Sequence, residues 1–529
     1  MLVSWLASSR QPGYEFIKYL SKMRRSASFA LLCIAASVIS SAQATAQPPP
    51  KTDLPPVVAP TDSFFGLVRE RDRDAARRFY KKSIDVKGMP VAASAEVADL
   101  ALQRTYELVT RLLAGRPDVL ASMVTNGMYL IVIGKDQVYT DMPEYRNHPN
   151  PQYQNERVRG TGGKPTSFGE ENLLSLPLDR YDDESIGLHE FCHTIDSTLR
   201  ALDPDWAERK NAVFRRATQK GLWKNTYAAS NPGEFWAEIC QSYFDCNRVN
   251  NWNHGPIGTR EQLKIYDPDS YELVRDAFKL GPDQDYRYQW LQKLPNVGPP
   301  PAKFKIDPFY TRFTWAREFT VLGRQAGDEP LLKANDTIRK MFAYRHDILK
   351  ALIADGVKLV VLGRNERLSD LPELAGKTGI DLSARALEYR PETRLLVVGE
   401  ESLAPQARVE CLLIGEFARA LYYVTGTRPA DPNWNNRGRD VQQYELRVKR
   451  LDEEFGQRLK LLYQNAMTRG LWKGTAAARD QVEYWAQGVV AYFDGVPPSN
   501  DRPATTRETL KAYDPDLYQL VNETMAYEG

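Results

Sequence analysis

Apolar residues recur along this chain at two spacings, which together predict both helices and strands. Residues 97–113 and 338–353 have apolar side chains at helical spacing. Short apolar runs followed by glycine, at 129–133 and 358–362, predict buried strands. The glycine-rich segment 160–169 predicts a loop. The pattern therefore indicates a mixed architecture.

Two later segments, 185–199 and 232–244, also have the pattern of helices. Asn231 supplies an N-cap for the second of them, and Pro232 suits the first helical position. Because helices outnumber strands, we expect an α+β fold that is mainly helical and has a small mixed sheet.

The two halves of the chain resemble each other. Four strings recur in the same order and at similar spacing: MYLIVIGKDQVYTDMPE with VKLVVLGRNERLSDLPE, TQKGLWK with TRGLWK, EFWA with EYWA, and LKIYDPD with LKAYDPD. Ordered recurrence of this kind indicates duplication of one domain of roughly two hundred residues.

Proline clusters mark the expected domain boundaries. Residues 1–46 are predicted to be an N-terminal extension and signal peptide, followed by a proline-rich, extended linker at 47–61. The first domain then spans 62–297, a second proline-rich linker 298–304, and the repeat 305–529.

The export signal consists of a basic pair, a small apolar stretch and a small-residue cleavage site. Arg24 and Arg25 precede the apolar segment 26–40, and we expect cleavage after Ala46. An uncleaved membrane anchor is the alternative. We therefore expect a secreted or periplasmic protein that has no stable membrane span after cleavage.

The segment His189-Glu190-Phe191-Cys192-His193 is an HExxH motif. Histidines at positions i and i+4 project from one helix face, where they can bind one zinc ion, while Glu190 reaches a water molecule. With 5 histidines in 529 residues, residue frequencies give a chance occurrence on the order of a few in a thousand. Cys192, inside the motif, is predicted to be a core residue rather than a thiol nucleophile.

A catalytic zinc needs a third protein ligand and an open position. A histidine six residues after His193 is excluded, because Leu199 stands there. Glu234 and Glu238 lie one turn apart, so that one could ligate zinc and the other could orient a ligating histidine. Asp196 is a further candidate for orienting a histidine, with a plain structural carboxylate as the alternative.

HEFCHTID, Tyr227 and NPGEFWAE together resemble the gluzincin catalytic domain of anthrax lethal factor and the Pro-Pro endopeptidases. The resemblance covers roughly residues 62–280 and implies a zincin-like fold with one zinc ion. It implies that His189, His193 and Glu234 bind that zinc. It further implies that Tyr227, seven residues before Glu234, assists catalysis beside Glu190.

The repeat lacks these residues and is predicted to be a degenerate, non-catalytic zincin-like domain. Gly415 aligns with His189, Arg419 with His193, Ala476 with Tyr227 and Gln487 with Glu238, whereas Glu483 aligns with Glu234. The repeat could cover the active site, bind substrate, target the enzyme or only complete a core.

Composition and charge narrow the expected partners. Lysine and arginine number 70 against 68 acidic residues, and this balance gives no indication of nucleic acid binding. Four cysteines remain after the signal segment, which allows a disulfide but does not indicate a disulfide scaffold; they are Cys192, Cys240, Cys246 and Cys411.

We therefore expect a secreted zinc-dependent endopeptidase that acts on an extended peptide or protein. Strand 129–133 could be a sheet edge that pairs with the peptide, or an ordinary interior strand. One alternative is an extracellular binding protein that keeps zinc without hydrolysis, and another is hydrolysis of a non-protein amide such as a cell-wall peptide. The oligomeric state is open.

Overall fold

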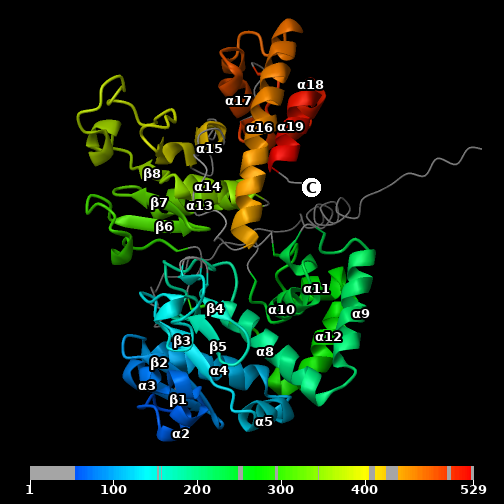
Figure 1. Ribbon diagram of the computed structural model, residues 1–529. Coiled ribbons are helices and arrows are strands. Elements are labelled where there is room, and N and C mark those ends of the chain that lie inside the picture. Colours follow the sequence, from blue (N-terminus) through cyan, green and yellow to red (C-terminus); the bar gives the residue numbers. More distant parts are fainter. Residues whose placement is uncertain are drawn as a thin grey trace, which may run out of the picture. The chain divides into compact units, whose positions relative to one another are not determined.

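The computed structural model describes residues 54–151, 154–155, 158–224, 226–247, 254–291, 296–343, 345–403, 412–424, 439–496 and 502–525 (Figure 1). The predicted signal segment, its cleavage site after Ala46 and Cys411 lie outside these residues. No helix in the described ranges combines the length and apolar character needed to cross a membrane.

The first half contains a five-stranded mixed sheet in the order β1-β2-β3-β5-β4. Strands β2, β3 and β5 run parallel, and β1 and β4 pair antiparallel at the two edges. The strands are β1 (Tyr80–Val86), β2 (Met89–Ser94), β3 (Leu130–Ile133), β4 (Gly160–Thr161) and β5 (Thr166–Gly169). Strand β3 is therefore interior, and the edge next to β5 is β4.

Both faces of β3 are buried, which explains its continuous apolar sequence. Leu130 and Val132 pack into the larger core beneath the helices, whereas Ile131 and Ile133 pack with Phe64 on the opposite face. This alternation follows from the two-residue period of a strand.

Helices pack against this sheet, and the regular elements that follow β5 in the first half are all helices (Figure 1). The helices of this half are α2 (Asp62–Leu67), α3 (Glu70–Phe79), α4 (Asp99–Leu112), α5 (Pro117–Thr125), α7 (Glu170–Leu173), α8 (Ile186–Leu202), α9 (Trp206–Gln219), α10 (Pro232–Tyr243), α11 (Arg260–Tyr266) and α12 (Pro268–Phe278). A short 3-10 turn, η2 (Tyr227–Ala229), precedes α10.

The second half repeats this order of elements around a four-stranded sheet, β6-β7-β8-β9. Its strands are β6 (Arg312–Ala316), β7 (Phe319–Gly323), β8 (Lys358–Leu362) and β9 (Leu395–Gly399). Its helices are α13 (Asp328–Met341), α14 (His346–Ala354), α15 (Leu412–Val424), α16 (Arg439–Thr468), α17 (Gln481–Tyr492), α18 (Arg507–Tyr513) and α19 (Pro515–Met525), and η9 (Ala476–Ala478) precedes α17. The expected α+β class, mainly helical with small mixed sheets, is confirmed.

Matching buried contacts recur in the two halves. The indole nitrogen of Trp223 donates to Asp267 at 2.9 Å, and that of Trp472 donates to Asp514 at 2.8 Å. The two tryptophans share a positive φ, near 62° and 60°. Equivalent polar contacts in the cores of both halves agree with duplication of one domain.

The proline-rich segments contribute to the sheets rather than standing wholly apart. Val58 pairs with Ser83 of β1 through two backbone hydrogen bonds, and Gly298 pairs with Phe313 of β6 in the same manner. An extended strand-like segment therefore precedes each sheet, because proline favours extended backbone.

The prediction of a loop at 160–169 was wrong, because this segment contains β4 and β5. Its glycines mark a close approach to α8 rather than a loop. A Cβ on Gly160 would lie 2.6 Å from Ile186 and 2.9 Å from Glu190, and one on Gly162 would lie 2.6 Å from the Cβ of His193.

The prediction of one helix across 338–353 was also wrong. Helix α13 ends at Met341, and α14 begins at His346. Phe342 is buried, and the backbone turns so that the amide of Arg345 donates to the carbonyl of Phe342 at 3.2 Å. Both helices bury apolar residues in the same core. Their apolar spacings therefore run on from one helix to the next and predict a single helix from the sequence.

Candidate metal centre

Helices α8 and α10 carry the residues of the HExxH motif and the downstream glutamate. Ser185 caps α8, and Asn231 caps α10 through its side-chain oxygen, which accepts from the amides of Gly233 and Glu234 at 2.9 and 3.0 Å. The indole of Trp236 donates to the carbonyl of Cys192 at 2.9 Å. That bond fixes α10 against α8, so that Glu234 faces the two histidines.

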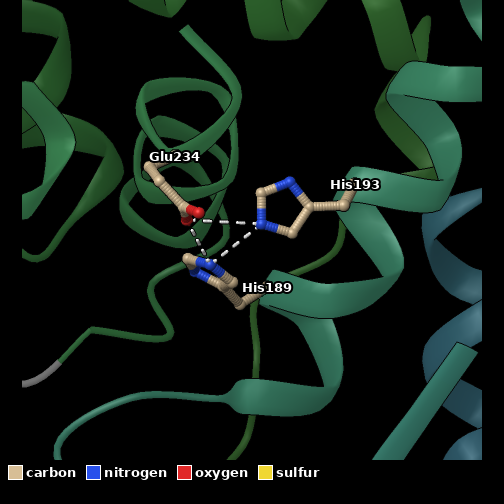
Figure 2. A group of neighbouring side chains, drawn as sticks. All are labelled: His189, His193 and Glu234. Atoms are coloured by element: carbon tan, nitrogen blue, oxygen red, sulfur yellow. Dashed lines mark hydrogen bonds and ion pairs between the residues drawn. The ribbon is translucent and has the colours of Figure 1, made fainter. Parts of the chain in front are cut away.

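Three ligand atoms converge between these helices (Figure 2). The Nε2 atoms of His189 and His193 are 3.2 Å apart, and the Glu234 Oε2 lies 3.1 Å from the first and 3.4 Å from the second. A tetrahedral cation with bonds of about 2.0–2.1 Å holds its ligands about 3.3–3.4 Å apart. The three residues could therefore hold a metal ion.

The tautomer of His189 suits metal binding. Its Nδ1 lies 3.0 Å from the Oε1 of Gln241, and an amide oxygen can only accept a hydrogen bond. Nδ1 therefore carries a proton, so that Nε2, which faces His193 and Glu234, is the nitrogen available to a metal ion. Glu238, whose Oε1 is 3.7 Å from the same Nδ1, lies beside this bond.

The surrounding charges favour a cation in this pocket. Although burial opposes a charged imidazole, the hydrogen bond to Glu234 and the carboxylates of Glu238, Glu190 and Glu184 raise the pKa of His189 to about 10. The pKa of Glu234 is lowered well below its usual range, because its contacts with the two histidines outweigh its burial. A bound metal ion would supply the positive charge that this site attracts.

Glu190 stands beside the ligands and is positioned by the sheet. Burial raises the pKa of its carboxyl, an effect that the two histidines and the backbone amide of Gly162 oppose. Gly162 follows the edge strand β4, and a Cβ there would lie 3.0 Å from the carbonyl oxygen of Glu190, so this turn of α8 lies against the sheet edge.

Tyr227 lies on η2, the short turn that precedes helix α10. The residue is 44% exposed, yet desolvation of the phenol and the nearby carboxylate of Glu234 raise its pKa well above the usual range. The phenol therefore keeps its proton and can donate it. The predicted residues His189, Glu190, His193, Tyr227 and Glu234 thus come together in one place.

Asp196 has a different environment from these residues. Its carboxylate accepts hydrogen bonds from Trp206 at 2.7 Å, from the buried Lys210 at 2.7 Å and from Arg200 at 2.8 Å. These contacts join α8 to α9, and within the described residues Asp196 has no interaction with either histidine of the motif. This environment favours the structural alternative for Asp196.

The buried cysteines near the motif are free thiols. Cys192, Cys240 and Cys246 form no disulfide with one another, and burial raises the pKa of Cys240 and Cys246 well above the usual range. The interpretation of Cys192 as a core residue is confirmed by its complete burial.

Three further polar residues lie near the site, namely Glu184, Gln241 and His254; the sequence predicts His254, in NNWNHGPIG, to be a loop residue, with substrate binding as the alternative. The ligand atoms of Glu184, Glu238 and His254 lie within 4.8 Å of one another. Gln241 follows Glu238 on α10 at i+3, a spacing that indicates a shared helix face. No comparable sequence pattern indicates Glu184, and none indicates that His254 lies beside Glu238.

In the second half, an arginine takes the place of the metal ligands. Arg419 donates two hydrogen bonds to Glu483, at 2.6 and 2.9 Å, and a third to Glu416 at 2.7 Å. Trp485 donates to the carbonyl of Ala418 as Trp236 does to Cys192, so Arg419 occupies the position of His193. Among the described residues of this half, no group of His, Cys, Asp and Glu side chains is suited to a metal ion.

No family model, curated protein or solved structure matches this chain.

Proposed function

We propose that the first half is a zinc-dependent endopeptidase that hydrolyses peptide bonds outside the cytoplasm. The observation that carries the proposal is the convergence of His189, His193 and Glu234 beside a further carboxylate, Glu190, that is not needed as a ligand. Two histidines and one carboxylate are a ligand set of catalytic zinc sites, which keep one position open.

Zinc bound by these ligands would supply Lewis acidity, which acidifies water and polarises a carbonyl group. Glu190 accepts the proton of the attacking water and later delivers it to the leaving amine. Burial, which raises the pKa of this carboxyl, makes it a better proton acceptor than a carboxylate in water.

Tyr227 donates its phenolic hydrogen to the oxyanion that develops from the scissile carbonyl. Its elevated pKa keeps the hydroxyl protonated. A donor positioned in this way stabilises developing charge and contributes about 2.7–4 kcal/mol to catalysis.

The edge strand β4 is the place where an extended peptide would bind. It is the free edge of the sheet nearest Glu190, whereas β3 is interior and cannot pair with a further chain. Peptides commonly bind such edges by adding a strand. The export signal predicted in residues 1–46 supports a substrate outside the cytoplasm.

The proposal is tested by incubating wild type and Glu190→Gln with a diverse peptide mixture and identifying the cuts by mass spectrometry. The variant should bind the same amount of zinc and lose about 10²–10⁴-fold in turnover, because the proton acceptor is removed. Equal cleavage by the two proteins would contradict the mechanism. Zinc binding without cleavage by wild type would instead favour a binding protein or a non-peptide substrate.

A further inference from the structure

We infer that His254 is a positioning residue that ties the metal ligand His189 to Tyr227 through the buried carboxylate of Glu238. Its role at His189 requires only the metal site, whereas its role at Tyr227 rests on the proposed peptidase function.

Glu238 depends on His254 for its hydrogen bonding. The Glu238 side chain is fully buried, and its Oε2 has no hydrogen-bond partner. Its Oε1 lies 2.9 Å from the Nδ1 of His254, which gives Glu238 its only hydrogen bond within the described part of the chain. A buried carboxylate without a donor is costly, so His254 determines where this carboxylate rests.

The same carboxylate lies beneath the metal ligand. Glu238 Oε1 is 3.7 Å from the Nδ1 of His189, whose hydrogen bond to Gln241 sets the orientation of the ring. Gln241 in turn donates to Glu184 at 3.0 Å, and Glu184 lies 3.4 Å from the Nδ1 of His254. The contacts form a closed ring, so displacement of His254 would change the orientation of the His189 ring.

His254 also contacts the turn that carries Tyr227. The two rings are 5.2 Å apart between centroids, and the amide of Ala228 donates to the carbonyl of His254 at 3.2 Å. One residue therefore supports both the ligand His189 and the proposed oxyanion donor.

The second half serves as an internal comparison. It retains the buried tryptophan contacts of the first half, but Val490 replaces Gln241, Gln487 replaces Glu238, and Ala476 replaces Tyr227. Two members of the ring, Glu238 and Gln241, are thus replaced in the half that lacks the metal-binding histidines. This indicates that the ring serves the site rather than the stability of the fold.

A second metal ion among Glu184, Glu238 and His254 is the competing interpretation of this cluster. The amide of Gln241 already donates to the Glu184 Oε2 that would be a ligand, and His254 is within ordinary hydrogen-bonding distance of Glu238. The first contact already uses the Glu184 oxygen that a cation would need. The second is a hydrogen bond from a protonated Nδ1 of His254, which leaves no lone pair there for a metal ion.

The test measures zinc release from the full-length chain into an excess of a chromophoric chelator. His254→Ala should release zinc about 10-fold faster than wild type, because partners behind the ligands affect metal affinity by about 10–100-fold. His254→Asn should stay close to wild type, since its amide can donate at the position of Nδ1. The double variant His254→Ala/Glu238→Gln should release zinc no faster than Glu238→Gln alone, because the two residues act as one unit.

Unchanged release from His254→Ala, or effects of the two substitutions that multiply, would overturn the inference. Two zinc ions per wild-type chain and one in His254→Ala would establish a second metal site instead. Because release is measured without substrate, a failure of the peptidase proposal would appear separately, as absence of cleavage by wild type. If wild type cleaves peptides, His254→Ala should lower kcat more than it changes KM.

Discussion

One pair of aligned residues, His193 and Arg419, shows how the retained glutamate of each half is partnered differently. Each stands on the helix that packs against a glutamate of the following helix, Glu234 or Glu483. The imidazole of His193 leaves room for a cation, whereas the guanidinium of Arg419 is itself the cation and binds Glu483 through two hydrogen bonds. An arginine therefore satisfies the retained carboxylate without metal.

Tyr227 is the residue whose proposed role is most easily separated from structure. The residue is 44% exposed, so loss of the hydroxyl should not disturb the core. We predict that Tyr227→Phe lowers kcat by about 10²–10³-fold with little change in KM, because the donor acts on the oxyanion. Steady-state kinetics on a peptide cut by wild type measure both constants.

An increase in KM with kcat unchanged would instead place Tyr227 in substrate binding. Zinc content of Tyr227→Phe should equal that of wild type, since Tyr227 is not among the three converging ligands.

At the scale of elements, the chemistry depends on how closely the sheet approaches helix α8. Gly160 and Gly162 allow β4 and the turn after it to lie against Glu190 and His193. These glycines hold the proposed base and a metal ligand beside the edge strand.

Gly162→Ala should therefore disturb both packing and the site. The new Cβ would lie 2.6 Å from the Cβ of His193 and 3.0 Å from the carbonyl oxygen of Glu190, neither of which is the end of a flexible side chain. We predict a loss of about 1–3 kcal/mol in the free energy of unfolding, together with weaker zinc binding. Denaturant titration of the zinc-free protein measures the first effect.

Gly66→Ala is the matched control for this substitution. Gly66 lies in helix α2, and a Cβ there would have no atom within 4 Å. Its stability should change by no more than about 1 kcal/mol, in the stabilising direction. Equal effects of the two substitutions would argue against close packing at Gly162.

The elements that the sequence predicted correctly have strong local signals. Helix α10 begins at Pro232 behind the cap Asn231, as expected, and β3 and β8 follow their apolar runs. The segment 160–169 was predicted wrongly because Gly160 and Gly162 are required by close packing against α8, a contact that the local sequence does not show. Contacts such as that of His254 with Glu238 depend likewise on tertiary packing and leave no local pattern.

At the scale of the whole molecule, the repeat extends further than the strings that revealed it. Glu171 forms two hydrogen bonds with Arg159, and Glu401 does so with Arg385 at the equivalent end of β9. Glu170 accepts from the amide of Ala98, and Glu400 accepts from that of Gly327. These pairs connect sheet and helices in each half and were not evident from the short recurring strings.

The scaffold is thus retained in both halves, and the ligand set is present in only one. The second half keeps Glu483 and lacks both histidines, so its buried carboxylate is bound by Arg419 and also by Arg479, at 2.8 Å. The chain therefore contains a candidate metal site in its first half and, at the equivalent place in its second half, a glutamate that is paired with arginines.

The most direct test of this assignment is the zinc content per chain of wild type and His193→Arg, measured by elemental analysis after dialysis. The substitution reproduces the arginine of the second half and lets Glu234 pair with a guanidinium as Glu483 does. We predict one zinc ion in wild type and none in the variant, with unchanged circular dichroism. Absence of zinc from wild type, a second tightly bound ion, or a full equivalent in folded His193→Arg would contradict a single site formed by His189, His193 and Glu234.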